Sequence, residues 1–208
     1  QVLAGNTPTP NEIPAGPPGQ LYQAIAGTSM SSPHTAGASA LIKAAHPDWT
    51  PGQIKSAQMT SSVQDVVNAD GSPAGIWDRG AGSLRVDRAV KPTVTFDVTG
   101  AAYTASVADP LHRVDLNLPS IKVDPLPGAI QVTRTLTNVS GKAQTFTASA
   151  TADAGLGITV SPNRFRVPAG GSATITVVLD GLKATDGDTL TGQITLKPSA
   201  GGASPVVL

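Results

Sequence analysis

The hydrophobic pattern of this chain changes its period part-way along, and this change restricts the fold more than any other feature. From about residue 114 onward, apolar and polar residues alternate. In IQVTRTLTNVS the residues of one face are Ile130, Val132, Arg134 and Leu136. The pattern recurs, with turn residues between, in QTFTASA, ITVSPNRFRVP, SATITVVLDG and LTGQITL. Alternation is typical of half-buried strands, and short strands at this even spacing predict an antiparallel β-sandwich.

The residues before this region predict helices as well as strands. Residues 2–4 and 21–26 read as short strands, and the loop 5–20 between them holds five prolines and three glycines. A helix is expected from near Ser29 to about Ala45. The residues of this helix are small and apolar on every face, which is typical of a buried helix.

The segment HPDWTPGQIKSAQMTSS predicts a second helix. Thr50 and Gln53 fit a capping box, and a proline follows Thr50 at the first helical position, where its missing N–H costs nothing. Ile54 and Ala57 would then face inward. Residues 77–90, WDRGAGSLRVDRAV, predict a glycine turn followed by a short helix.

Charge is distributed unevenly along the chain. Of the 28 charged residues, residues 1–62 hold four, which are Glu12, Lys43, Asp48 and Lys55. A stretch so poor in charge is usually interior or interface material. The simple explanation is that it forms the core of its own domain. Because the chain also begins with Gln1 in a segment that reads as a core strand, we expect instead a piece of a larger domain whose packing partners lie elsewhere.

Composition excludes several classes of function. Lys and Arg together number 14, as do Asp and Glu, so the net charge is zero and no strong attraction to nucleic acid or anionic membranes is expected. The absence of cysteine excludes disulfides, thiolate chemistry and cysteine-ligated zinc. No apolar run reaches about 18 residues, and no signal peptide is visible.

The stretch GTSMSSPHTAG, residues 27–37, places a serine hydroxyl at the start of the first helix. The helix dipole and free N–H groups favour negative charge there, so the N–H of Ser29 can help to hold an oxyanion. Gly27 lets the backbone approach a substrate closely. These features fit a nucleophile, although a serine at this place can also simply cap the helix.

Longer motifs decide between these interpretations. GTSMSSPHTAG followed by AHPDWTPGQIKSAQMTSS closely resembles the region around the catalytic serine of subtilisin-like serine proteases, the subtilases. DRGAGSLRVDRAV resembles the end of the catalytic domain in their larger plant-type members, and VDLNLPSIKV and VTRTLTNVS resemble the fibronectin-III-like domain that follows. The resemblance implies the C-terminal portion of a parallel-sheet α/β catalytic domain, followed by an all-β fibronectin-III-like sandwich.

The resemblance also implies the domain limits, the location and the partners. The catalytic part would span residues 1–98 and the sandwich residues 114–208, with residues 99–113 as a linker that has room for one strand. Members of this kind are secreted to the extracellular space and cleave proteins or peptides. Calcium is an expectation for the complete enzyme, while no cofactor or metal site is expected in this chain.

By the same resemblance, Ser29 is the nucleophile, and the backbone of Gly27, Thr28 and Ser29 contacts the substrate and the oxyanion. The family also needs an Asp, a His and an oxyanion-hole Asn. Residues 1–28 hold no Asp and no His, and Asn6 and Asn11 are too near the serine to match that Asn. We therefore expect the isolated chain to be nearly inactive. The missing groups would come from the upstream part of the same domain, joined covalently or as a separate chain.

Other candidate residues have simpler explanations. Five residues of helix separate the directions of Ser29 and His34 by roughly 140°, so His34 is not expected to act as the base. His46 is expected to bond a carbonyl at a helix end, and His112 lies in the linker. Asn138-Val139-Ser140 is a glycosylation sequon, with a turn-forming Asn138 as the favoured alternative. Asp180, Asp186 and Asp188 could suggest a calcium site, but aspartates followed by or near glycine are more often simply turn residues.

Two other functions stay open from the sequence. The sandwich can be the working unit, as a structural or protein-binding module beside an inert catalytic remnant. Alternatively, Ser29 with a weak improvised base can hydrolyse activated esters, which are easier acyl donors than amides.

Overall fold

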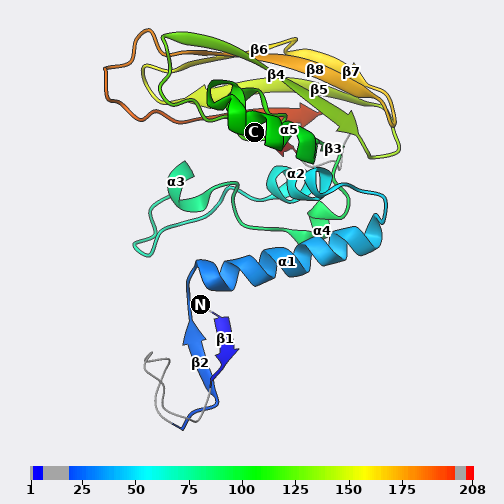
Figure 1. The fold of residues 1–208 in the computed structure, drawn as a ribbon, viewed down its shortest axis with the longest axis vertical. Helices are drawn as coiled ribbons and strands as arrows, with labels where there is room; N and C mark the ends of the chain where they lie inside the picture. Colours follow the sequence, from blue (N-terminus) through cyan, green and yellow to red (C-terminus); the bar gives the residue numbers. More distant parts are fainter. Residues whose placement is uncertain (1, 7–18, 200–204) are drawn as a thin grey trace. The chain divides into compact units, whose positions relative to one another are not determined.

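The computed structural model describes residues 2–6, 19–199 and 205–208, and the chain divides into two compact units, residues 1–41 and 42–208. In the first unit, β1 (Val2–Gly5) pairs antiparallel with β2 (Tyr22–Ile25) (Figure 1). Helix α1 (Thr28–Ala45) begins in the first unit, and its last residues belong to the second. Both strands and the helix were expected. Most of the predicted loop falls at residues 7–18, outside the described residues.

The antiparallel pairing of β1 and β2 differs from the parallel sheet that the resemblance implies. Within the described part of the chain, all strand pairs are antiparallel. The partners of a parallel sheet are therefore not among these strands.

Helix α2 (Pro51–Ser61) begins as predicted. The Thr50 hydroxyl accepts from the Gln53 N–H at 3.1 Å, and the Thr50 N–H donates to the Gln53 side chain at 3.0 Å. Ile54 and Ala57 are buried, which confirms the expected inner face. Two short helices follow α2, namely α3 (Ile76–Arg79) and α4 (Val86–Ala89). A small core next to α2 is formed by Ile42, Ile54 and Ala89, with Trp49 and Val90 against it.

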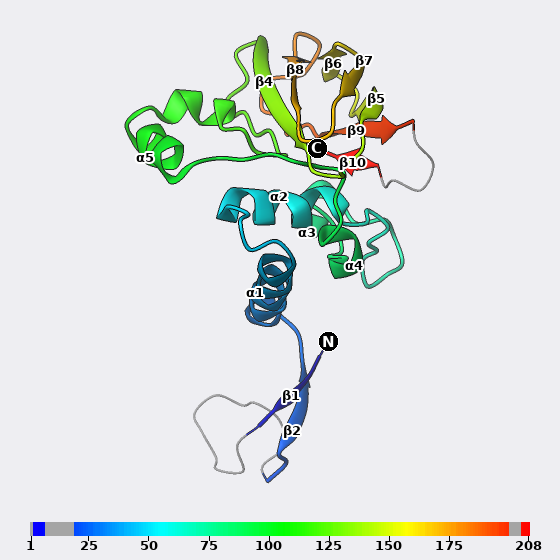
Figure 2. The same ribbon diagram turned by 90° about the vertical axis from the view of Figure 1, so that its right-hand side faces the viewer.

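Two four-stranded antiparallel sheets form the predicted sandwich (Figures 1 and 2). One sheet has the order β3 (Val94–Thr95), β4 (Ala129–Asn138), β8 (Ser172–Asp180), β6 (Gly157–Ser161). The other has the order β10 (Val206–Val207), β9 (Gly192–Pro198), β5 (Gln144–Ala152), β7 (Arg164–Val167). Alternate residues of β4 are buried, as the sequence pattern predicts, because one face of each sheet covers the core.

The region predicted as a linker is helical. It holds α5 (Gly100–Ala108), which begins with the Thr99 side chain accepting from the Ala102 N–H, and most of the 3₁₀ helix η1 (Pro110–Asp115). The expectation of a strand there is therefore wrong. The sheet also takes in residues on the N-terminal side of this region, because β3 pairs with β4.

Arg134 is the unusual member of the sandwich core. It lies on the inward face of β4 and is only 1% exposed. Its guanidinium donates to four backbone carbonyls, those of Leu118, Thr133, Val114 and Ser120, at 2.7, 2.8, 2.9 and 3.3 Å. Burial lowers the pKa of Arg134 to about 10, so the side chain stays charged at neutral pH. The arginine thereby ties the irregular segment 114–120 to β4.

Candidate active site

Ser29 occupies the second position of α1 and is exposed. Immediately before the helix, Gly27 has a φ of 154°, a conformation that residues with side chains rarely adopt. Its carbonyl accepts from the N–H groups of Met30 and Ser31 at 3.0 and 3.2 Å. The helix thus begins at Thr28, and Ser29 lies inside the first turn, so Ser29 does not occupy the capping position.

The amide groups at this end of α1 determine whether it can hold a negatively charged oxygen. Of the described residues, none accepts a hydrogen bond from the N–H of Thr28 or Ser29, and none bonds the Ser29 hydroxyl. These N–H groups lie at the positive end of the helix dipole. An exposed hydroxyl beside such an amide is the arrangement needed for an attacking oxygen and a partial oxyanion hole.

A base for Ser29 is missing from the described part of the chain. His34 instead donates through Nδ1 to the Met30 carbonyl at 2.6 Å, one turn earlier in its own helix. His46 bonds the Val90 carbonyl through Nε2 at 2.7 Å, and its ring stacks on Trp49 at 3.8 Å. The carbonyl bond expected of His46 is confirmed.

The third histidine belongs to an exposed surface pair. His112 lies in η1 with its Nδ1 2.7 Å from a carboxylate oxygen of Asp109. This hydrogen bond raises the pKa of His112 and lowers the pKa of Asp109. The pair can carry charge at the surface, but neither residue belongs to the segment around Ser29.

The glycosylation sequon is used for structure. Asn138 is fully buried, and its Nδ2 donates to the carbonyls of Lys142 and Val167 at 2.7 and 3.1 Å. Its Oδ1 accepts from the N–H and the hydroxyl of Ser140. With both N–H bonds already made inside the fold, Asn138 is the turn-forming residue that the alternative predicted.

Two of the three aspartates considered for calcium hold turns. The Asp180 carboxylate accepts from the Leu182 N–H at 2.9 Å, and the Asp188 carboxylate accepts from the Thr185 N–H at 3.0 Å. In the described residues, no group of three or more His, Cys, Asp or Glu side chains is placed to hold a metal ion. None of the described helices has the length and hydrophobicity that crossing a membrane requires.

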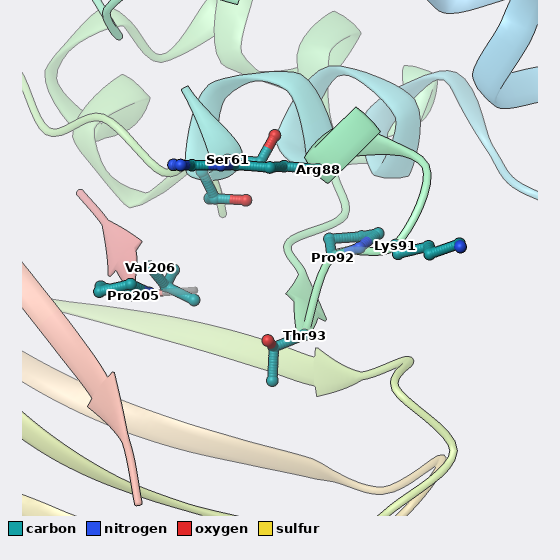
Figure 3. A pocket seen from close by; sticks show the side chains of 8 residues that line it. Ser61, Arg88, Lys91, Pro92, Thr93, Pro205 and Val206 are labelled. Atoms are coloured by element: carbon teal, nitrogen blue, oxygen red, sulfur yellow. The ribbon is translucent and has the colours of Figure 1, made fainter. Parts of the chain in front are cut away.

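A small pocket lies where the end of α2 faces the sandwich (Figure 3). Its walls are formed by Thr60, Ser61, Arg88, Lys91, Pro92, Thr93, Pro205 and Val206. None of the predicted site residues lines it.

Comparison with known families agrees with the motif analysis. The model of the family described as "Subtilase family" matches residues 2–90, and the model described as "Fibronectin type-III domain" matches residues 115–207. Residues 2–90 belong to the subtilase family. This subtilase segment contains α1 with Ser29, α2, α3 and α4, and the fibronectin type-III match covers β4 to β10.

Curated relatives match most of this chain. Subtilisin-like protease SBT2.6 of Arabidopsis thaliana is 32% identical over 88% of this chain, and subtilisin-like protease SBT2.5 of the same plant is 31% identical over 88%. The chain spans about a quarter of the length of these relatives, 26% in both cases.

Proposed function

We propose that this chain supplies the nucleophile segment of a secreted subtilisin-like serine endopeptidase. The observation that carries the proposal is the exposed Ser29 hydroxyl at the start of α1, beside a backbone amide that no described residue bonds, within a segment that belongs to the subtilase family. The substrate would be a protein or peptide. No residue of this chain is assigned to a cofactor, and any calcium would bind in the rest of the enzyme.

In the proposed reaction, the Ser29 oxygen attacks the carbonyl carbon of the scissile peptide bond. Its proton passes to a histidine outside this chain, and the negative charge on the carbonyl oxygen is held by the Ser29 N–H together with an asparagine outside this chain. The histidine then returns the proton to the amine, which leaves. Water hydrolyses the resulting ester and restores Ser29.

The order of the catalytic residues along the sequence supports the assignment of the base to a part of the enzyme outside this chain. In subtilisin, Asp and His precede Ser in the sequence. Residues 1–28 contain neither Asp nor His, and His34 is engaged within its own helix. The base and its orienting carboxylate are therefore assigned to the upstream part of the same catalytic domain.

The test is cleavage of a fluorogenic peptide by this chain combined with the upstream part of a relative's catalytic domain. Ser29→Ala should lower turnover on the order of 10⁶-fold, the loss known for the serine of a subtilisin. Ser31→Ala, a matched change at an exposed serine one half-turn further on, should leave turnover nearly unchanged. Equal loss in the two variants would contradict the assignment of Ser29.

A further inference from the structure

Helix α2 of the subtilase segment meets the sandwich through a hydrogen bond in the middle of the helix. The backbone N–H of Phe96 donates to the Ser56 hydroxyl at 2.8 Å. Ser56 and Phe96 are each 1% exposed, and Phe96 belongs to the main core of the sandwich. A buried amide of the sandwich core is thus satisfied by a hydroxyl from α2, and removing that hydroxyl would leave the amide unpaired.

The first turn of α2 makes a second connection. The Thr50 hydroxyl donates to the Asp97 carboxylate at 2.7 Å, which places a negative charge at the positive end of the helix. The chain after β3 also lies very close to Gly52. A Cβ added there would collide with Asp97 and would stand 2.9 Å from the Val98 nitrogen. The absence of a side chain at residue 52 therefore permits the contact.

Asn117 extends this connection into the sheet. Its Nδ2 donates to the Asp97 carbonyl at 3.2 Å and to the Thr135 carbonyl at 2.8 Å, and its Oδ1 accepts from the Thr135 N–H at 2.8 Å. The side chain thus pairs with the edge of β4 in the way that a strand residue would. A continuous set of hydrogen bonds runs from the cap of α2 through Asp97 and Asn117 to β4.

Further contacts lie at other places on the same boundary. The last turn of α2 shares the small pocket with β10, through Thr60, Ser61 and Val206 (Figure 3). Arg79 of α3 also lies within hydrogen-bonding distance of the Gln193 side chain on β9, at 3.4 Å. The sandwich therefore meets α2 at its beginning, middle and end.

We infer that the sandwich is a structural partner of the subtilase segment and that residues 42–90 unfold together with it as one cooperative unit. Ser56, Asp97 and Asn117 are among the residues that join them. This assignment is distinct from the proposed catalysis, because it holds whether or not Ser29 is a nucleophile. It also opposes the idea that the sandwich is an independent binding module beside a remnant.

The chain offers separate probes for the two parts. Both tryptophans, Trp49 and Trp77, lie in the subtilase segment, so their fluorescence reports its unfolding. Hydrogen exchange of the β4 and β8 amides, followed by mass spectrometry at increasing urea, reports the sandwich. In the full chain the two probes should give the same midpoint, because coincident transitions are the mark of cooperative unfolding.

Two serines of α2 supply a matched pair of variants. Ser56→Ala should raise the unfolding equilibrium constant on the order of tenfold in both probes, because the Phe96 amide loses its partner. The control is Ser61→Ala, since that buried hydroxyl donates to the Ala57 carbonyl of its own helix, at 2.6 Å, and bonds no described residue of the sandwich. Its effect should be clearly smaller.

Two results would overturn the inference. The first is a fluorescence transition in the unaltered chain that is complete before β4 and β8 lose protection. The second is a Ser56→Ala variant that shifts the fluorescence midpoint and leaves the exchange midpoint of the sandwich in place. If Ser56→Ala fails to fold, the comparison of the two probes in the unaltered chain still decides the question.

Discussion

Replacing Arg134 with methionine should lower the stability of the chain substantially. The methionine keeps most of the aliphatic stem but removes the guanidinium, which makes four hydrogen bonds to backbone carbonyls. At about 1.5 kcal/mol for each bond that involves a charged group, these bonds contribute roughly 6 kcal/mol. The carbonyls of Leu118 and Val114 would lose this buried partner.

The desolvation of the charge opposes this contribution. The fall in the pKa of Arg134 to about 10 corresponds to roughly 3 kcal/mol by which burial disfavours the charged form. Removing the charge recovers that amount, so the net loss of unfolding free energy should be about 3 kcal/mol. Arg134→Lys should recover only part of the loss, because an ammonium cannot reproduce the planar fork of donors.

Urea unfolding of the full chain, followed by circular dichroism, measures this change. Because the lowered pKa of Arg134 is still far above neutrality, the difference between the variant and the original chain should be constant between about pH 6 and 8. A methionine variant that is equally or more stable would refute the reasoning, since buried charges can be replaced without loss when their hydrogen bonds contribute little.

Three further changes test local features. Gly52→Ala should lower the free energy of unfolding by about 1–3 kcal/mol, because the new methyl group collides with the chain after β3. The control is Gly37→Ala in α1, where the new methyl group would meet no described atom within 4 Å, and it should be neutral or stabilising. Urea unfolding midpoints of the two variants measure the difference. Asn138→Asp should cost about 2 kcal/mol through its two lost donors, and the unaltered chain from a glycosylating host should carry no glycan at Asn138 by intact mass. Hydrogen bonds from Thr191 hold the pKa of Asp153 below its usual range. The ionised carboxylate therefore contributes its full stabilisation of the fold above the ordinary Asp pKa of about 4, and this contribution is lost as the pH falls through the lowered pKa. Asp153→Asn should therefore reduce the acid dependence of stability, and an unchanged pH profile would argue against this role.

The parts of the fold that follow from local pattern were predictable. Small residues from Ser29 to Ala45 and the capping pair Thr50 and Gln53 predicted α1 and the start of α2. Alternation placed Arg134 on the inward face of β4. These features depend on residues close together in the sequence, where periodicity and capping leave a direct signal.

The parts that depend on distant contacts were not predictable from pattern. Three of the four carbonyl partners of Arg134 lie in residues 114–120, which have no regular period, and Ser56 meets Phe96 across 40 residues of sequence. Helix α5 did leave a signal that was missed, because Thr99 precedes an alanine-rich segment and caps it.

The site itself was predicted from motif resemblance more than from physical pattern. The exposed position of Ser29, beside an amide that bonds no residue in the described part of the chain, agrees with the expected nucleophile, but the helix start alone also allowed a capping serine. The structure adds that Ser29 lies inside the first turn. The identity of the base depends on residues that this chain does not contain near Ser29.

The most direct test of the central proposal is reaction of the Ser29 hydroxyl with a fluorophosphonate probe. The chain is treated alone and together with the upstream part of a relative's catalytic domain, and the adduct is located by peptide mass spectrometry. The proposal predicts an adduct on Ser29 only in the mixture, since only there does a base activate the hydroxyl. A mixture that cleaves peptide but carries its adduct on another serine, or an isolated chain that labels fully at Ser29, would contradict the account.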